Sequence, residues 1–320
     1  MARKKTEVQQ YLNFLQLINS KGGNKDMGIP INKGKIETAK KIVIYGPEGI
    51  GKSTLASKLP DPVFIDTEGS TKELDVMRYP APKSWLDVVA FVKDFGEEAP
   101  GKTLVIDTAD WAEQLCIQYT CSQLNVKGIE DVGYGKGYVY LAETFSAFLK
   151  VCDTLIDRGL NVVFTAHAQM RKFEQPDELG AYDRWEMKLS KKVAPLLKEW
   201  ADMVLFCNYK TNVITDSKTN SKKATGGSRV MYTSHHPCWD AKNRYGLPET
   251  VPMDFEPIAK LFEGITIKKN DVDYRLKLRE YMKDMTKEQK AFIIDDYGIN
   301  ASTTNAQYKI IYERLTTGGN

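Results

Sequence analysis

The sequence predicts an α/β fold in which helices cover both faces of a mostly parallel, twisted sheet. Short apolar runs alternate with stretches of helical periodicity as far as residue 207, which is the pattern of consecutive β-α-β units. Residues 208–234 have the pattern of two strands joined by a polar tip over 216–228, so an antiparallel hairpin is expected at one edge. After residue 252 the patterns are helical, which predicts a small helical C-terminal unit.

Strands are expected where short apolar runs are bounded by polar, Gly or Pro residues. These runs cover residues 41–45, 63–65, 103–106, 161–165 and 203–207, with a further strand near 74–79. Helices are expected where apolar residues recur at intervals of three and four. They cover residues from 52 to before Pro60, 84–95, 109–124, 138–158 and 191–200, and then 257–262, 272–285, 287–297 and 305–315. Residues 168–190 have no clear period and are expected to form a long polar loop.

These patterns divide the chain into three regions. Residues 1–35 begin basic and contain an amphipathic stretch over 8–18 before a Gly-rich tract, so they are expected to form an N-terminal helix and a linker. Residues 36–252 are expected to form the core, and residues 253–320 the helical C-terminal unit.

The composition is that of an ordinary globular protein. The chain has 320 residues, of which 42% are hydrophobic and 27% charged, with a formal net charge of +3. This charge is too small to predict nucleic-acid binding by itself. Five cysteines without a C-x-x-C pair indicate reduced thiols and not a disulfide framework. No apolar run is long enough to span a membrane and no signal peptide precedes the charged start, so a cytoplasmic location without a membrane partner is expected.

The first expected strand runs directly into a Gly-rich loop. The loop reads Gly46-Pro47-Glu48-Gly49-Ile50-Gly51-Lys52-Ser53 and continues with Thr54. This is G-x-x-x-x-G-K-[ST] in full, in which glycines let the backbone turn tightly and point its amides at a phosphate. Lys52 is expected to bind the β- and γ-phosphates and Ser53 to ligate Mg²⁺. The loop therefore predicts binding of a nucleoside triphosphate, taken to be ATP, together with Mg²⁺.

Two carboxylates follow apolar runs at the sheet edge where α/β proteins bind ligands. Asp107 ends the run over 103–106 and is expected to hold Mg²⁺ beside Ser53. Glu68 closely follows the run over 63–65 and is expected to orient and deprotonate the attacking water. The plainer alternatives are a turn aspartate at a strand end and an exposed loop glutamate.

Three stretches resemble the RecA family. Residues 46–52 resemble its phosphate loop, in which Pro and Glu occupy the same two variable positions. Val63-Phe64-Ile65-Asp66-Thr67-Glu68 resembles the RecA strand that ends in the catalytic glutamate, and Phe164-Thr165-Ala166-His167 falls where RecA-like proteins carry a polar sensor of the γ-phosphate. That sensor is usually Gln, so His167 departs from the pattern and Gln169 stays open as the alternative. The resemblance implies a RecA-like P-loop ATPase core.

A basic pair after the last core strands resembles the finger of DnaB-type hexameric helicases. The segment reads Ala241-Lys242-Asn243-Arg244-Tyr245-Gly246, and RecA has a comparable lysine pair. In those families the cations contact the γ-phosphate bound by the neighbouring subunit. The resemblance implies that Lys242 and Arg244 act in the same way in a ring or filament, whereas the spacing alone fits a solvated basic turn equally well.

The whole pattern over residues 42–249 looks most like the short RecA-like ATPases of bacteriophages, which act in single-strand annealing and recombination. The resemblance implies an ATPase that depends on single-stranded DNA, oligomerises on it and promotes annealing or strand exchange in the host cytoplasm. A single-strand-binding protein is compatible with that role as a further partner. A hexameric helicase or translocase and a nucleotide-gated loader or scaffold are the alternatives.

Two segments are expected to contact single-stranded DNA, because mixed cations and aromatic rings can follow phosphates and stack on bases. They follow the strands that end at Asp107 and His167, where the DNA-facing loops of RecA relatives lie. The residues are Lys127, Tyr134, Lys136 and Tyr138 in the first segment, and Arg171, Lys172, Phe173, Arg184 and Trp185 in the second. The second segment also carries acidic residues, so a charged surface loop is the alternative.

Overall fold

The structure of the protein is a computed structural model that describes residues 33–174, 180–215, 222–268, 274–299, 303 and 305–317. The chain divides into two units, Met1–Glu37 and Thr38–Asn320. Residues 33–37 are the described part of the first unit, so the amphipathic stretch predicted over 8–18 lies outside the described residues.

The described strands of the second unit form one sheet with a parallel centre. The parallel strands lie in the order β7-β1-β5-β4-β2-β3. The antiparallel strands β8 and β10 extend the sheet beyond β7, while β6 pairs with β5 and β9 with β7. Their bounds are β1 Lys41–Gly46, β2 Pro62–Asp66, β3 Met77–Arg78, β4 Thr103–Asp107, β5 Asn161–Glu174, β6 Ala181–Met187, β7 Met203–Thr215, β8 Lys222–Tyr232, β9 Lys242–Asn243 and β10 Thr250–Pro252.

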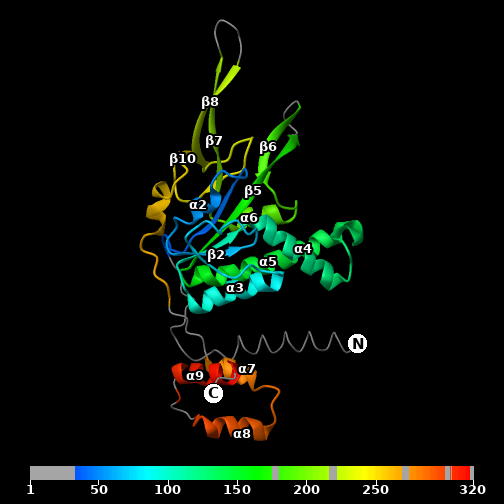
Figure 1. The fold of residues 1–320 in the computed structure, drawn as a ribbon, viewed down its shortest axis with the longest axis vertical. Coiled ribbons are helices and arrows are strands. Elements are labelled where there is room, and N and C mark those ends of the chain that lie inside the picture. The colour runs from blue at the N-terminus through cyan, green and yellow to red at the C-terminus, as the bar shows by residue number, and fades with distance from the viewer. Residues whose placement is uncertain are drawn as a thin grey trace. The chain divides into compact units, whose positions relative to one another are not determined.

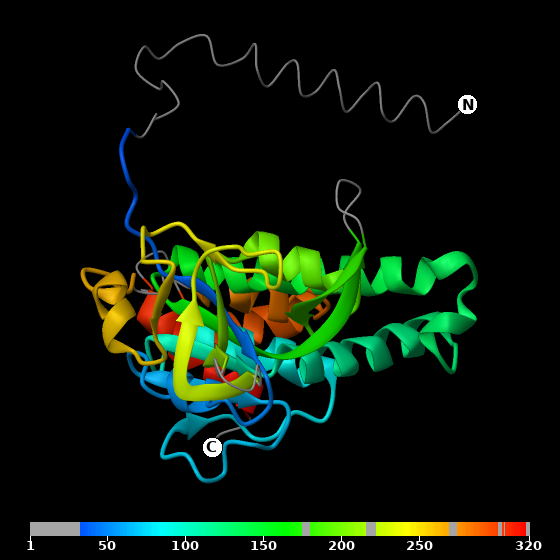
Figure 2. The same cartoon turned by 90° about the horizontal axis from the view of Figure 1, so that it is seen from above.

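Helices pack on both faces of this sheet (Figure 1). Residues of α3, α4, α5 and α6 belong to the core on one face, and residues of α2 and the 3-10 helix η3 belong to the core on the other. Helices α4 and α5 pack against each other and protrude together to one side in two perpendicular views (Figures 1 and 2). Their bounds are α2 Lys52–Ala56, α3 Trp85–Glu98, α4 Ala109–Leu124, α5 Lys136–Asp157, α6 Val193–Trp200 and η3 Glu256–Phe262, with η1 Ile129–Asp131 and η2 Gly133–Gly135 between α4 and α5.

Alternation along the central strands builds these two cores, because successive side chains of a strand point to opposite faces. In β1, Val43 and Tyr45 belong to the core under α3 to α6, whereas Ile42 and Ile44 belong to the core under α2. Both faces of β1 are therefore buried, which explains why the strand reads as a continuous apolar run in the sequence.

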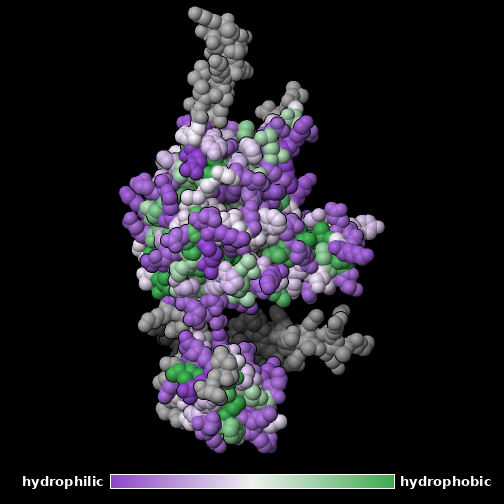
Figure 3. Space-filling model, in the orientation of Figure 1, coloured by the Kyte–Doolittle hydropathy of each residue, from purple (hydrophilic) through white to green (hydrophobic). Residues whose placement is uncertain are grey.

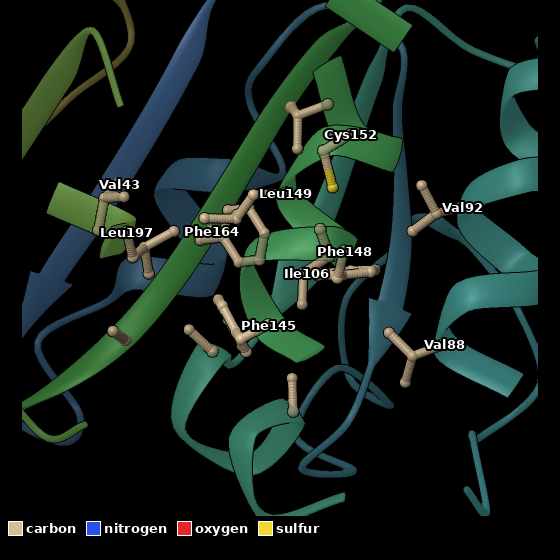
Figure 4. Close-up of a cluster of buried hydrophobic side chains, with 14 of the residues drawn as sticks. Val43, Val88, Val92, Ile106, Phe145, Phe148, Leu149, Cys152, Phe164 and Leu197 are labelled. Carbon is tan, nitrogen blue, oxygen red and sulfur yellow. The ribbon is translucent and has the colours of Figure 1, made fainter. Parts of the chain in front are cut away.

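Aromatic rings join the strands to the helices in the larger core (Figure 4). Phe164 of β5 is fully buried and makes edge contacts with Phe148 of α5, at 6.3 Å between ring centroids, and with Trp200 of α6, at 5.6 Å. Such pairs stabilise a core beyond the area they bury. Phe164 thus fixes two helices against the buried part of β5, which reaches His167.

Three further helices lie in the C-terminal region, at α7 Tyr274–Tyr281, α8 Lys287–Asp296 and α9 Asn305–Thr317. Leu278 of α7 and Tyr308 and Ile311 of α9 form a small buried cluster. Helix α8 begins at a capping box in which Thr286 accepts from the backbone N–H of Gln289. The predicted helical character of this region agrees with the described residues.

The protein surface seen in Figure 3 is mostly hydrophilic, and its apolar side chains form small separate groups. In the part of the chain that the structure describes, no helix has the length and apolar character needed to cross a membrane.

The predicted fold class is confirmed, but the prediction of a long loop over 168–190 is wrong. Strand β5 continues to Glu174 and pairs antiparallel with β6. This hairpin extends beyond the sheet (Figure 1), and its side chains alternate between exposed and half-buried from Met170 to Glu174. The less exposed face of this ribbon includes charged side chains such as Arg171 and Glu186, so the alternation leaves no hydrophobic period in the sequence. Similarly, residues 222–228 of the predicted polar tip belong to β8.

We expect Phe164→Ala to lower the free energy of unfolding by about 3–5 kcal/mol, because it removes a fully buried ring and leaves a cavity. Urea denaturation followed by circular dichroism measures the change. Leu86→Ala on α3 is the control, since Leu86 is 58% exposed, and it should change the free energy by less than about 0.5 kcal/mol. A Phe164→Ala loss no larger than that of the control would contradict the packing described here.

Candidate functional site

The Gly-rich loop lies at the carboxyl end of β1, which runs between β5 and β7. Gly51 has a φ of +104°, and a Cβ at this position would lie 2.7 Å from Nη1 of Arg229. A Cβ at Gly46 would collide with the backbone carbonyl of Cys207 on β7. These two positions therefore require glycine, and they allow the chain to turn from β1 into α2.

Lys52 lies against this loop and not in solvent. Its side chain is buried, and Nζ donates to the carbonyl oxygens of Gly46 at 3.1 Å and Pro47 at 3.0 Å. Burial lowers the pKa of Lys52, and the carboxylates of Asp107 and Asp110 oppose that shift. The ammonium group is thus held at the loop, where the phosphates of a nucleotide are expected.

The carboxylate of Asp107 is fully buried at the end of β4. It accepts hydrogen bonds from hydroxyl groups of three elements. Ser53 Oγ of α2 donates to Oδ2 at 2.7 Å, and Ser70 Oγ of the loop after β2 donates to the same oxygen at 3.3 Å. The hydroxyl of Thr165 on β5 donates to Oδ1. Hydroxyl and carboxylate oxygens are the ligands that Mg²⁺ prefers, so Ser53 and Asp107 fit the ion that the sequence predicts.

The carboxylate of Asp66 shapes the loop that carries Glu68. It accepts the backbone N–H groups of Glu68, Gly69, Ser70 and Thr71 at 3.2, 2.6, 3.2 and 3.0 Å, and the Thr71 hydroxyl at 2.6 Å. Burial raises the pKa of Asp66, but these hydrogen bonds outweigh it and hold the pKa below its ordinary value. Asp66 thereby fixes the turn that brings Glu68 to the site.

His167, at the end of the buried part of β5, lies between two carboxylates. Its Nδ1 is 2.8 Å from Oδ2 of Asp110, and its Nε2 is 3.8 Å from Oε1 of Glu68. The hydrogen bond with Asp110 raises the pKa of His167 above its ordinary value, against the effect of burial. Burial raises the pKa of Glu68, and His167 opposes that shift. The predicted general base and the predicted sensor are therefore neighbours.

These elements enclose a cavity of about 380 Å³. Of the residues predicted from the sequence, Lys52, Ser53, Glu68 and His167 line it, and Asp107 contacts it through its hydrogen bond with Ser53. Gln169, the alternative sensor, instead donates to the carbonyl of Met187 in the hairpin. The lining residues are Glu48, Gly49, Gly51, Lys52, Ser53, Thr54, Glu68, Ser70, Glu73, Leu74, Thr108 and His167.

Sequence analysis does not find two residues of this site. Asp110 lies in the first turn of α4, where an acidic residue is an ordinary helix-start signal. The spacing of three residues from Asp107 is its one available signal. Arg229 of β8 donates through Nη1 to the carbonyl of Ile50 at 3.2 Å. The hairpin of β7 and β8 is predicted from the sequence, but the placement of β7 beside β1, which brings Arg229 to the loop, is encoded by no local pattern.

The predicted finger residues do not belong to the cavity lining of their own chain. Lys242 Nζ donates to backbone carbonyls at the end of α6, within residues 198–201, and burial lowers the pKa of Lys242. Arg244 Nη1 is 2.7 Å from Oδ1 of Asp202, and the Arg244 side chain is 59% exposed. Arg244 is thus accessible at the surface, while Lys242 caps a helix.

Two of the predicted DNA contacts on the β5–β6 hairpin are held inside the protein. Arg184 is buried, forms an ion pair with Asp240, and has its guanidinium 4.9 Å from the ring centroid of Phe173. Trp185 is half-buried, and its backbone N–H donates to the carbonyl of Cys238 at 2.7 Å. Both residues connect the hairpin to the segment that precedes β9.

The other predicted residues of this hairpin, Arg171, Lys172 and Phe173, line a groove of about 360 Å³ between the hairpin and α6. Four cations and two carboxylates line the groove, so its net charge is positive. These charged residues are Arg171, Lys172, Glu186, Lys191, Lys198 and Asp240.

The first predicted DNA segment lies where α4 and α5 are joined. Lys127, Tyr134 and Lys136 are exposed there, and the ring of Tyr134 has no cover from the described residues. Tyr138 is half-buried and its hydroxyl lies 3.3 Å from Oε1 of Glu130. Three of these four side chains are therefore free to meet a ligand.

Three comparisons show which known proteins this chain resembles. A family model described as an AAA domain matches residues 38–245. The SPbeta prophage-derived uncharacterized protein YorG of Bacillus subtilis (strain 168) is 26% identical over 136 residues, which span 40% of this chain and 41% of that relative. The match thus spans less than half of the relative's length. A KaiC-like protein of Pyrococcus horikoshii OT3 aligns over 60% of this chain and 84% of its own, with 12% identity and a TM-score of 0.31.

We expect Asp66→Asn to destabilise the protein by about 1–3 kcal/mol near neutral pH, because an amide is a weaker acceptor than a carboxylate. The pKa of Asp66 is lower in the folded than in the unfolded state. Its stabilisation is therefore present above about pH 4 and is lost as the pH falls through the folded-state pKa. Urea denaturation at several pH values should show the two proteins converging in stability towards low pH.

The exposed Asp75, which follows in the same connection between β2 and β3, supplies the matched control. Asp75→Asn should leave the free energy of unfolding within about 0.5 kcal/mol of the unmodified protein. A difference between Asp66→Asn and the unmodified protein that stayed constant or widened on acidification would contradict the role given to Asp66.

Proposed function

The chain belongs to the AAA domain family, and from this premise we propose that it hydrolyses ATP and oligomerises on single-stranded DNA, where it promotes annealing or strand exchange. The observation that carries this proposal is the meeting of Lys52, Ser53 and Glu68 at one cavity beside the buried Asp107. Enzymes that transfer a phosphoryl group to water combine a phosphate-binding loop with a cation, oxygen ligands for a metal and a group that orients the water.

In the proposed reaction Lys52 binds the β- and γ-phosphates, and Glu68 takes a proton from the water that attacks the γ-phosphorus. The raised pKa of Glu68 brings this carboxylate closer to the pH at which it works, which makes it a better base. Ser53 and Asp107 are the residues that would hold Mg²⁺, and the bound ion would supply positive charge at the phosphate oxygens.

The basic pair is proposed to complete the site of an adjacent copy. Arg244 is accessible, and a planar guanidinium suits the charge that develops on a transferred phosphoryl group. Lys242 would have to leave the carbonyl groups of α6, so Arg244 is proposed as the principal contact with Lys242 beside it. The resemblance to DnaB-type and RecA proteins supports this arrangement.

Single-stranded DNA is proposed to follow the positive groove beside the β5–β6 hairpin and to reach the exposed Tyr134. Arg171 and Lys172 would contact phosphates, and Phe173 would stack on a base. Arg184 and Trp185 are proposed only to support the hairpin, since both are engaged within the protein. The prophage origin of one relative supports a role in phage recombination or replication in the host cytoplasm, with a single-strand-binding protein as a further partner.

The rate of ATP hydrolysis with and without single-stranded DNA tests this proposal. Stimulation by the DNA supports it, and hydrolysis that DNA leaves unchanged favours a nucleotide-gated loader or scaffold. ATP-driven unwinding of a forked duplex would favour a helicase or translocase instead. Electron microscopy with an ATP analogue and an oligonucleotide reports whether rings or filaments form.

We expect Glu68→Gln to bind ATP normally but to lose hydrolysis by roughly 100-fold or more, because the amide cannot accept the proton of the attacking water. Binding of a fluorescent ATP analogue and phosphate release measure the two steps separately. Lys52→Ala is the comparison variant, which should lose binding as well. A Glu68→Gln protein that retained full turnover would exclude Glu68 as the base.

We expect a mixture of Arg244→Ala and Lys52→Ala proteins to regain part of the turnover that each lacks. Some interfaces in such a mixture combine an intact Lys52 from one copy with an intact Arg244 from the next. Phosphate release across a series of mixing ratios measures the effect. Mixtures no more active than either parent would speak against a finger that acts between copies.

A further inference from the structure

We propose that Asp110 is a positioning residue for hydrolysis, which acts through His167 on Glu68. The proposal rests on the ATPase function proposed above, and it assigns a role to a residue that neither the phosphate loop nor the strand-end carboxylates indicate. Asp110, His167 and Glu68 come from α4, from β5 and from the loop after β2, so the contact joins three elements around the cavity.

Asp110 holds His167 with both carboxylate oxygens. Oδ1 accepts the backbone N–H of His167 at 3.1 Å, and Oδ2 lies 2.8 Å from Nδ1 of the ring. The side chains of both residues are 8% exposed. A buried carboxylate with two contacts to one residue fixes the position of its backbone and the rotation of its ring together.

This contact also decides which ring nitrogen faces Glu68. When Nδ1–H donates to Asp110, the neutral imidazole carries no hydrogen on Nε2. Nε2 is the atom that lies 3.8 Å from Oε1 of Glu68. The Glu68 side chain is 29% exposed, and catalytic hydrogen bonds that are long without substrate often shorten in the substrate complex.

The arrangement gives the proton of the attacking water a path. The water O–H bond breaks, and its proton goes to a carboxylate oxygen of Glu68 as the oxygen bonds to phosphorus. The new O–H bond of Glu68 then breaks as Nε2 of His167 accepts the proton, and the imidazolium is stabilised by Asp110. Glu68 returns to its ionised form, and the imidazolium releases the proton to solvent water before the next turnover.

The charges around the ring fit this role. Asp110 from α4 and Glu68 from the loop after β2 favour the protonated ring, whereas Lys52 from α2 opposes it. Asp107 from β4 and Asp110 add to the negative charge that Glu68 meets. Of these groups Asp110 contacts the ring directly at hydrogen-bond distance. Removal of the Asp110 carboxylate should therefore change the pKa of the His167 ring more than removal of any of the other groups.

A structural role is the competing explanation, because an aspartate in the first turn of a helix stabilises that helix whatever it contacts. The structural explanation requires only that Asp110 stabilises α4. The positioning explanation requires that Asp110 sets the protonation of the His167 ring and also that this ring affects hydrolysis.

Nuclear magnetic resonance of the full chain with labelled histidine rings tests this directly, since the chain has only three histidines. In the unmodified protein we expect the neutral form of His167 to carry its proton on Nδ1, and the pKa of the ring to lie above its ordinary value. In Asp110→Asn we expect that pKa to fall and the proton to distribute over both nitrogens. The resonances of His235 and His236 should not move. A His167 ring unchanged by Asp110→Asn would overturn the proposal.

Steady-state hydrolysis gives the second measurement. We expect Asp110→Asn to lower kcat by roughly 10-fold or more, as part of the 10²–10⁴-fold that general base catalysis supplies, while the affinity for a fluorescent ATP analogue stays within about twofold. The effect should be largely absent in a His167→Gln background, because Asp110 acts through that ring. Effects of the two substitutions that simply multiply would overturn the proposal.

Glu113→Gln is the matched control, since Glu113 is a buried carboxylate on the same helix that accepts from the backbone N–H of Ser190 and not from His167. It should leave kcat within about twofold, and a loss equal to that of Asp110→Asn would favour the structural explanation. The two hypotheses can fail separately. If the unmodified protein hydrolyses no nucleotide, the proposed function fails, whatever the ring does. If it hydrolyses ATP and Asp110→Asn changes the ring but not kcat, only the positioning role fails.

Discussion

The buried carboxylate of Asp107 is the interaction on which the rest of the site depends. It accepts hydrogen bonds from the hydroxyl groups of Ser53, Ser70 and Thr165. It therefore joins the start of α2, the loop after β2 and the strand β5 to the end of β4. A fully buried carboxylate is tolerated only where hydrogen bonds replace its hydration. The Gly-rich loop before α2, the loop after β2 that carries Glu68, and the strand β5 that carries His167 are therefore held in one arrangement by a single side chain. A shift in any of them disturbs the partners of the other two.

One strand connects this arrangement to the surface. Strand β5 passes from Thr165 and His167 at the cavity into the hairpin with β6, and the ion pair of Arg184 with Asp240 fastens that hairpin to the segment before β9. The same segment leads into Lys242 and Arg244. The hairpin proposed for DNA is thus joined through Asp240 to the segment that carries the residues proposed to contact a neighbouring copy, which offers a physical connection between the two.

The sequence predicts the parts of the protein that follow local rules. The phosphate loop, the buried parallel strands and Asp107 at a strand end all have patterns that depend on neighbours along the chain. The β5–β6 hairpin has no apolar period in the sequence, because its less exposed face includes charged side chains such as Arg171 and Arg184. Asp110 and Arg229 were missed because their partners, His167 and Ile50, lie 57 and 179 positions away. Their roles arise from strand order, which no residue pattern within a short window can encode.

The charges at the cavity explain why a second copy of the chain is proposed to take part in ATP hydrolysis. Lys52 is the one lysine or arginine among the described residues that line it, while Glu48, Glu68 and Glu73 also line it and Asp107 lies in contact. A triphosphate brings several further negative charges to this low-dielectric place, where repulsion between like charges is stronger than in water. The ammonium group of Lys52 cannot balance them by itself, and Arg229, the other cation beside the loop, donates to the carbonyl of Ile50. In the proposed function, a divalent cation held by Ser53 and Asp107 would supply part of the missing charge, and Arg244 of an adjacent copy would supply positive charge at the atom where charge develops. The deficit within the chain thus accounts for both the metal and the neighbouring copy in the proposed function.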